Sequence, residues 1–286
     1  MNQLLVDLLK VLTLERLELN LFRGESRDIG SPQVFGGQVL GQALIAATAT
    51  VENRVVHSLH AYFLRRGDFN APIVYEVDRA RDGVHFCTRR IVAIQHGEQI
   101  FNMSASFQVL ENGLDHQIAM PQVAPPDLLR NVESYFDEIV TRIPVRARRY
   151  IEQKRPFEFR PVEAPNFLNP EKLPPHKNIW FRAVDALPDD EALHRCLLAY
   201  VSDFNLLDTA IMPHAMSLVV RNLVMASIDH AMWFHRKVRV DEWLLYSTDS
   251  PSASGARGFA RGSVFAQDGT LLASTAQEGL LRQIEQ

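Results

Sequence analysis

The chain has 286 residues, 47% of them hydrophobic and 22% charged, and a formal net charge of −4. This composition is typical of a soluble globular protein with one large or two ordinary domains, and the acidic balance argues against nucleic acid as the main partner. No apolar run is long enough to cross a bilayer, and Asp7 and Lys10 within the apolar opening segment favour an amphipathic helix over a signal peptide. We therefore expect a cytoplasmic protein with no membrane and no nucleic-acid partner.

The first half of the chain predicts one helix followed by successive antiparallel strands. Alternation of apolar and polar residues from Leu17 predicts a strand, and residues 34–48 predict a helix that packs closely against a sheet. Gly36 and Gly37 lower the helix propensity of this segment, so we expect another part of the chain to approach its backbone there. A turn at 96–97 joins the last two of four further strands. These strands are predicted at residues 55–65, 71–81, 84–95 and 100–110.

The second half repeats this order, which indicates an internal duplication. Its predicted elements are strands at 157–163 and 178–184, an apolar helix at 197–212, and strands at 223–236, 242–250, 258–267 and 270–282. Alignment of HSLHAYFLRR with SIDHAMWFHR places His57 opposite Ser227. Alignment of the last strands of the two halves places Ala105 opposite Gln277.

We therefore expect an α+β fold of two units, in each of which an antiparallel sheet wraps around a central helix. The first unit covers residues 1–110, the second covers 155–286, and residues 111–154 connect them. The connector contains MPQVAPP, which is not regular structure throughout, and a basic cluster. Attraction of a phosphorylated ligand and a solvated helix face are both open interpretations of this cluster. Its members are Arg146, Arg148 and Arg149.

Asp203 lies within the apolar segment 197–212. If this segment is a helix, the neighbours of Asp203 three and four residues away are apolar or aromatic, so its carboxylate projects from the buried side. A buried carboxylate needs hydrogen-bond donors or becomes neutral. Asp203 is therefore either a residue that caps or pairs within the core, or one that carries chemistry.

The sequence lacks the local signatures of several other chemistries. A serine nucleophile elbow needs G-x-S-x-G, and a zinc hydrolase needs a pattern such as H-E-x-x-H; neither occurs. Glu191 and His194 form a lone E-x-x-H, which we interpret as a surface pair because a di-iron site needs further ligands. Cys87 and Cys196, each beside an apolar residue, predict buried free thiols. We expect no metal and no cofactor.

Seven motifs resemble the acyl-CoA thioesterase II family, whose members have a tandem (double) hot-dog fold: VFGGQVLGQAL, HSLHAYFLRRGD, YVSDFNLLDTAI, ASIDHAMWFHR, EWLLYS, SASGARGF and ASTAQEGLLR. The resemblance extends from Leu14 to Arg282. It implies hydrolysis of fatty acyl-CoA to free fatty acid and CoA, in which an Asp, a Thr or Ser, and a Gln hold a water. At the matching positions these residues are Asp203, Ser227 and Gln277. It also implies a homo-oligomer, a dimer or a tetramer.

These residue types suit hydrolysis of a thioester by water. A partly desolvated Asp203 suits a general base, and a hydroxyl and an amide each offer a donor and an acceptor that can orient a water. Because the first half has His57 and Ala105 at the matching positions, we expect one competent site per chain.

Gly37, Gln38 and His57 are candidate substrate-binding residues, because paired units bring their helices together. For the glycines, close helix packing is the competing explanation. Two other functions remain open: an acyl-CoA hydratase or dehydratase that uses His57 or His60 with an Asp, and a non-catalytic acyl-CoA binding module. A hydratase would convert enoyl-CoA without release of free thiol.

Overall fold

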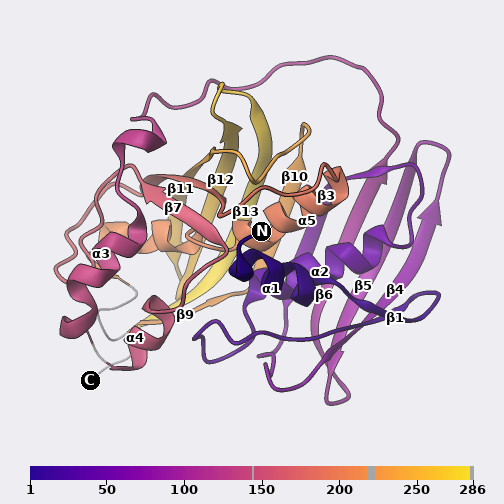
Figure 1. The fold of residues 1–286 in the computed structure, drawn as a ribbon, viewed down its shortest axis with the longest axis horizontal. Coiled ribbons are helices and arrows are strands. Elements are labelled where there is room, and N and C mark those ends of the chain that lie inside the picture. The colour runs from indigo at the N-terminus through magenta and orange to yellow at the C-terminus, as the bar shows by residue number, and fades with distance from the viewer. Residues whose placement is uncertain (144, 218–222, 284–286) are drawn as a thin grey trace.

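The structure is a computed structural model that describes residues 1–143, 145–217 and 223–283, with the side chains of 145–147 outside the described set. Its strands form one antiparallel sheet of 13 strands, and two helices, α2 (Gly36–Thr48) and α5 (Glu191–Ser202), lie side by side against it (Figure 1). The strands of the first half are β1 (Glu15–Glu18), β2 (Leu21–Gly24), β3 (Val55–Phe63), β4 (Ile73–Asp82), β5 (Phe86–Gln95) and β6 (Glu98–Gln108). Those of the second half are β7 (Phe157–Pro161), β8 (His176–Ala183), β9 (Leu223–Ser227), β10 (Asp229–Phe234), β11 (Leu244–Ser254), β12 (Arg257–Ala266) and β13 (Leu271–Gln283).

The strand order confirms the predicted repetition. Along the sheet it is β1-β2-β4-β5-β6-β3-β10-β13-β12-β11-β8-β7, with β9 paired to β13 beside this path. The second half mirrors the first, so β3 and β10 meet at the seam between the two units. Their register pairs His60 with Ala231 and Ala61 with His230. Because His60 and His230 are the aligned histidines of the two halves, this register relates the units by an approximate twofold rotation.

Helices α2 and α5 pack closely because glycines on α2 remove side chains from their contact. A Cβ added to Gly36 would lie 2.7 Å from Oδ2 of Asp203, and one added to Gly37 would lie 2.2 Å from the carbonyl oxygen of Tyr200. The predicted close approach to this backbone is thus confirmed. A glycine in a helix costs about 1 kcal/mol of stability relative to alanine. At Gly36 and Gly37 this cost is needed for close contact between the two units, because a Cβ would collide with residues of the second unit.

The remaining helices pack around this arrangement, and the first of them contacts α2. The amphipathic helix α1 (Gln3–Leu12) buries Leu5, Leu8 and Leu12. The connector runs from the first half to the second along the upper edge of the view (Figure 1). Its first part packs apolar side chains, among them Met120, on Trp180 and its neighbours in the second unit. Its later part contains η1 (Pro126–Leu128), α3 (Val132–Ile139), η2 (Val140–Arg142) and α4 (Val145–Ile151).

The strand predicted from Leu17 is wrong in one respect, because it is a hairpin of two short strands, β1 and β2. The chain turns at 19–20, where the carbonyl oxygen of Asn20 accepts a hydrogen bond from the Val77 N–H and its side-chain oxygen accepts one from Arg79. Asparagine favours turns, but Asn20 also falls on the polar phase of the alternation. The pattern therefore shows no break at the turn.

The helix predicted over 197–212 is also wrong in its extent. Helix α5 begins at Glu191, where Asp190 caps its N-terminus, and ends at Ser202. Asn205 then has φ 63°, a left-handed conformation that stops the helix, and a 3₁₀ helix, η3 (Leu207–His214), follows. The segment is apolar on all sides because both helices are buried. Asp203 consequently lies at the C-terminal end of a helix and not within one.

Two local predictions are confirmed. His96 and Gly97 form the turn between β5 and β6 with φ of 52° and 78°, as a two-residue hairpin requires. Cys87 and Cys196 are both buried and free. Burial raises the pKa of the Cys196 thiol to about 12, which makes it a poor nucleophile.

The surface pair predicted from the E-x-x-H pattern is wrong. His194 is fully buried, and its Nδ1 accepts a hydrogen bond from the Val240 N–H at 3.2 Å. Glu191 accepts hydrogen bonds from Arg195 instead. The histidine therefore helps to join α5 to the chain before β11.

Candidate active site

Asp203 lies where the C-terminus of α5 meets the N-terminus of α2, at the junction of the two units. It is the C-cap residue of α5, and the N–H of Gly37 donates a hydrogen bond to its carboxylate. Helix α2 has Phe35 at its N-cap and no side-chain cap of its own. Because the first amides of a helix lack partners within the helix, Asp203 supplies an acceptor from the neighbouring unit.

The structure brings the three residues predicted from the sequence into one hydrogen-bonded network. Nε2 of Gln277 donates to Oδ1 of Asp203 at 2.7 Å and to Oγ of Ser227 at 3.0 Å. Oγ of Ser227 in turn donates to Oδ1 of Asp203 at 3.3 Å. Asp203 and Ser227 are half-buried, whereas Gln277 is 1% exposed. The network therefore has a buried amide at its base and a carboxylate and a hydroxyl within reach of a substrate.

A break in the sheet places Ser227 and Gln277 beside Asp203. The predicted strand 223–236 is not continuous, because it divides at Ile228 into β9 and β10. Both pieces pair with β13, and the register shifts between them. At this point the Glu278 N–H donates to the side chain of Asp229 at 2.6 Å. Irregularities of this kind re-aim side chains and are common next to active sites.

The carboxyl group of Asp203 has a raised pKa. Burial raises the pKa of Asp203 to about 6, and the hydrogen bonds from Gln277, Gly37 and Ser227 act in the opposite direction. A carboxylate with this pKa is mostly ionised at pH 7 and is still a stronger base than an ordinary aspartate. This combination is typical of a general base.

Gln277 also presents an acceptor that the described part of the chain leaves unused. Its Oε1 is buried and accepts no hydrogen bond from any described residue. A buried amide oxygen without a partner is costly. Since Nε2 of the same side chain already faces Asp203 and Ser227, Oε1 suits a hydrogen bond from a small molecule bound at the network.

The three residues predicted to bind substrate differ in their surroundings. Gly37 contacts Asp203 directly, as described above. The side chain of Gln38 accepts a hydrogen bond from the N–H of Arg27 at 3.0 Å and so holds the segment before α2. His57 lies on β3, where its Nε2 is 2.8 Å from Oγ of Ser106 and its ring packs on Phe86. Neither Gln38 nor His57 has a described hydrogen bond to Asp203.

The matching positions of the first unit carry no such network. The C-cap residue of α2 is Ala49, where α5 has Asp203. Ala105 on β6 is opposite Leu59 and Arg89 and has no polar side chain. The two halves therefore share a framework but not the polar residues of the network.

Four polar side chains close to the end of α5 were not predicted from the sequence to be part of the site: Ser202, His230, Tyr246 and Thr275. Tyr246 donates to the carbonyl oxygen of Ser202 at 3.1 Å and lies 2.8 Å from Oγ1 of Thr275. The hydroxyl of Ser202 donates to a helix carbonyl and lies 2.9 Å from Nε2 of His230. Burial lowers the pKa of His230 to about 4, so it is neutral at pH 7. A tyrosine among the apolar residues of EWLLYS was the one available signal, since a buried tyrosine needs a partner for its hydroxyl.

Neither a metal centre nor a membrane-spanning helix is evident in the described residues. Within 1–143, 145–217 and 223–283, no group of three or more His, Cys, Asp or Glu side chains is placed to hold a metal ion. No helix in the same ranges is long and apolar enough to span a membrane.

Sequence comparison matches both halves of the chain to thioesterases. The acyl-CoA thioesterase family pattern matches residues 147–280, and the acyl-CoA thioesterase N-terminal domain pattern matches residues 23–108. Acyl-CoA thioesterase 2 of Haemophilus influenzae is 41% identical over 283 residues, which are 99% of each chain.

Solved structures agree with this match. An acyl-CoA thioesterase II from Mycobacterium marinum is 44% identical with a TM-score of 0.79, over 97% of this chain and 99% of that one. A protein with a hot-dog fold from Alicyclobacillus acidocaldarius has a TM-score of 0.79 at 19% identity, over 98% and 99% of the two chains. This second likeness concerns the fold alone. The chain thus has the expected double hot-dog fold and belongs to the acyl-CoA thioesterase II family.

Proposed function

We propose that the protein hydrolyses fatty acyl-CoA thioesters to free fatty acid and CoA, with a water molecule activated by Asp203, Ser227 and Gln277. The observation that carries the proposal is the single network that joins these three side chains at the junction of the units. The names of the relatives support acyl-CoA as the substrate.

In this mechanism Asp203 is the general base. Its carboxylate takes a proton from the water while the water oxygen attacks the thioester carbonyl carbon. The tetrahedral intermediate then expels the CoA sulfur, which receives the proton from Asp203. Oε1 of Gln277 accepts a hydrogen bond from the second proton of the water. The hydroxyl of Ser227 donates to Oδ1 of Asp203 and so orients the base. A positioned base contributes roughly 10²- to 10⁴-fold to the rate.

Helix α2 assists from the other unit. Its N-terminus is the positive end of a helix dipole and lies beside Asp203 through Gly37. This field offsets the negative C-terminal end of α5, which Asp203 caps, and it favours the negative charge that develops on the carbonyl oxygen of the substrate. The competent site therefore needs both units of the chain, although its three side chains come from the second.

The surroundings of Asp203 favour hydrolysis over hydration. A hydratase would need a histidine beside the carboxylate. Among the described residues, Asp203 accepts hydrogen bonds from Ser227, Gln277 and the Gly37 N–H, and not from a histidine. His60 packs on the ring of Trp233 instead.

Two substrate-binding residues, the number of sites, the oligomeric state and the location of the protein remain predictions. Roles of Gln38 and His57 in substrate binding are expected through parts of the acyl-CoA away from the reacting carbonyl. One competent site per chain, a homo-oligomeric dimer or tetramer, and a cytoplasmic location are likewise predictions.

A thiol-release assay over saturated acyl-CoAs from short to long tests the proposal. Asp203→Asn should lower kcat by roughly 10²- to 10⁴-fold because it removes the base. Asp208→Asn is the matched control, since this nearby aspartate pairs with Lys177 and lies outside the network. Full activity in Asp203→Asn, or hydration of enoyl-CoA without release of thiol by the unmodified protein, would contradict the proposal.

A further inference from the structure

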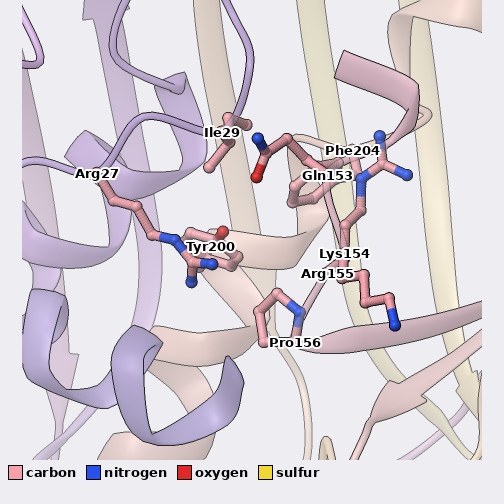
Figure 2. A pocket seen from close by; sticks show the side chains of 8 residues that line it. All are labelled: Arg27, Ile29, Gln153, Lys154, Arg155, Pro156, Tyr200 and Phe204. Atoms are coloured by element: carbon pink, nitrogen blue, oxygen red, sulfur yellow. The ribbon is translucent and has the colours of Figure 1, made fainter. Parts of the chain in front are cut away.

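Three cationic side chains flank a narrow pocket beside Phe204. The pocket is lined by Arg27, Ile29, Gln153, Lys154, Arg155, Pro156, Tyr200 and Phe204. Arg27 reaches towards Tyr200 from the first unit, and residues 153–156 face it from the end of the connector (Figure 2). The cavity itself has a volume of about 10 Å³, enough for roughly one water molecule. A ligand larger than this would reach these side chains only from the mouth of the pocket.

These cations lack acidic partners. Across the described ranges, none of Arg27, Lys154 and Arg155 forms an ion pair, whereas the neighbouring Arg149 pairs with Asp28. Arg27 and Arg155 are half-buried, and Lys154 is exposed. Cations without a carboxylate partner keep their hydrogen-bond donors available for a ligand that carries negative charge.

Aromatic rings hold one of these cations in place. The guanidinium carbon of Arg155 lies 4.7 Å from the ring centre of Tyr150 and 5.7 Å from those of Phe136 and Phe204. Its Nη2 donates a long hydrogen bond to the carbonyl oxygen of Tyr150 at 3.5 Å, and its side chain also forms a hydrogen bond with the side chain of Tyr150. Stacking orients a guanidinium while it leaves N–H donors available, and this arrangement suits phosphate recognition.

The pocket adjoins the candidate active site along the chain. Phe204 follows Asp203 directly, and the carbonyl oxygen of Tyr200 approaches Gly37. Phe35, next to Gly36 at the start of α2, packs on the rings of both Tyr200 and Phe204. One layer of aromatic side chains thus separates the cations from the network.

We propose that Arg27, Lys154 and Arg155 form the binding site for the phosphate groups of the CoA portion of the substrate. The inference rests on the proposed function, because CoA is the part of that substrate that carries phosphates. The three cations stand apart around the pocket (Figure 2), which fits a ligand whose negative charge is spread over a diphosphate and a further phosphate.

The proposed phosphate site does not include the basic cluster of Arg146, Arg148 and Arg149 that the sequence shows in the connector. Arg149 is neutralised by Asp28, and Arg148 donates to the carbonyl oxygens of Ile143 and Thr141. The side chain of Arg146 lies outside the described residues. The connector therefore contributes to the proposed site through its last residue, Lys154, and Arg155 is the first residue of the second unit.

Calorimetry with two probes, CoA and pantetheine, tests the site without any need for turnover. Pantetheine has the thiol arm of CoA but no phosphates. Arg27→Gln and Lys154→Gln should each lower the ratio of CoA affinity to pantetheine affinity about tenfold, the usual scale for one charged hydrogen bond. Arg130→Gln removes the same charge from an arginine already paired with Glu138, so it should leave this ratio within twofold of the original.

The same variants are then compared in turnover of an acyl-CoA and of the N-acetylcysteamine thioester of the same fatty acid. The ratio of the two kcat/KM values should fall about tenfold for Arg27→Gln. An unchanged affinity ratio, or an equal fall in the control, overturns the site. The site is also overturned if kcat/KM falls only for thioesters that bear a carboxylate at the far end of the acyl chain, because the cations would then bind the acyl chain and not CoA. Phosphate-dependent binding of CoA in a protein that releases no thiol upholds the site and refutes the proposed function.

Discussion

The hydroxyl of Tyr246 donates a hydrogen bond to the carbonyl oxygen of Ser202, the residue before Asp203, at 3.1 Å. The single proton of this hydroxyl is used there, so Thr275 is the donor in the 2.8 Å contact between their hydroxyl groups. Thr275 lies on β13 two residues before Gln277. Tyr246 therefore connects the end of α5, which carries Asp203, to the strand that carries Gln277.

Tyr246→Phe should lower kcat more than it lowers stability. Loss of the hydroxyl releases the end of α5, and small misplacements of a catalytic group are costly, so we expect kcat to fall roughly tenfold with KM little changed. Tyr75→Phe is a control within the same chain, because Tyr75 is equally buried at the matching position of the first unit and donates to Gln42. Both variants should lose about 1 kcal/mol of unfolding free energy. Equal kcat losses in the two variants would contradict a positioning role.

The pH dependence of kcat/KM should report the raised pKa of Asp203. With a pKa of about 6, the base is mostly protonated at pH 5, where about one-tenth of the activity remains, half ionised near pH 6, and almost fully ionised above pH 7. The expected profile rises about tenfold per pH unit below 6 and then reaches a plateau. A half-maximum near pH 4, the range of an ordinary aspartate, would show that the site does not hold Asp203 as described.

The same pKa predicts how stability depends on pH. Because the folded-state pKa is above the unfolded value of 3.8, the folded protein binds the extra proton between about pH 4 and pH 6. The contribution of Asp203 to stability is therefore fully present below pH 4 and is lost as pH rises through 6, by up to about 3 kcal/mol. Asp203→Asn removes this pH-dependent contribution to stability, and its side-chain oxygen can still accept a hydrogen bond from the Gly37 N–H. Its melting temperature should match the unmodified protein at pH 4 and equal or exceed it at pH 7; a large fall at pH 7 is the opposing result.

Activity should depend on a hydroxyl group at position 227, whether serine or threonine supplies it. Ser227→Ala removes both the donor to Asp203 and the acceptor for Gln277, so we expect kcat to fall roughly tenfold or more. Ser227→Thr keeps both hydrogen bonds and should retain kcat within about threefold. Steady-state kinetics on one acyl-CoA separates the two cases. Similar activity in the alanine and threonine variants would remove Ser227 from the mechanism.

The order of elements could be predicted from local patterns and their repetition, whereas the three network residues followed from the resemblance to the acyl-CoA thioesterase II family. Alternation and apolar periodicity locate α2 and most strands. The comparison of the two halves shows that the first has His57 and Ala105 where the second has Ser227 and Gln277. Close packing at Gly36 follows from glycine within an otherwise good helix. These signals lie within short stretches of the chain.

Features that depend on distant partners could not be predicted in this way. The break at Ile228 arises because β9 and β10 meet β13 in different registers, and neither strand shows this alone. The position of Asp203 at a helix end depends on one left-handed residue, Asn205. Likewise, Arg149 finds its carboxylate 121 residues away, while Arg155 finds none among the described residues, and local charge patterns do not distinguish the two.

Gly37→Ala should disrupt both the junction of the units and the reaction. A Cβ at Gly37 would lie 2.2 Å from the backbone oxygen of Tyr200, which cannot move without α5. We expect a loss of about 1 to 3 kcal/mol in unfolding free energy, and a fall in kcat because separation of the helices weakens the Gly37 hydrogen bond to Asp203. Gly41→Ala is the matched control.

At Gly41 the nearest atoms to an added Cβ are 3.3 and 3.4 Å away, and the closest belongs to the flexible side chain of Leu12. Small shifts relieve this contact, and alanine gains about 1 kcal/mol of helix propensity over glycine. The Gly41 variant should therefore be near neutral in both denaturant unfolding and thiol release. If Gly37→Ala behaves like Gly41→Ala, the close approach of α2 to α5 is not what positions Asp203, and the proposed dependence of the site on both units is wrong.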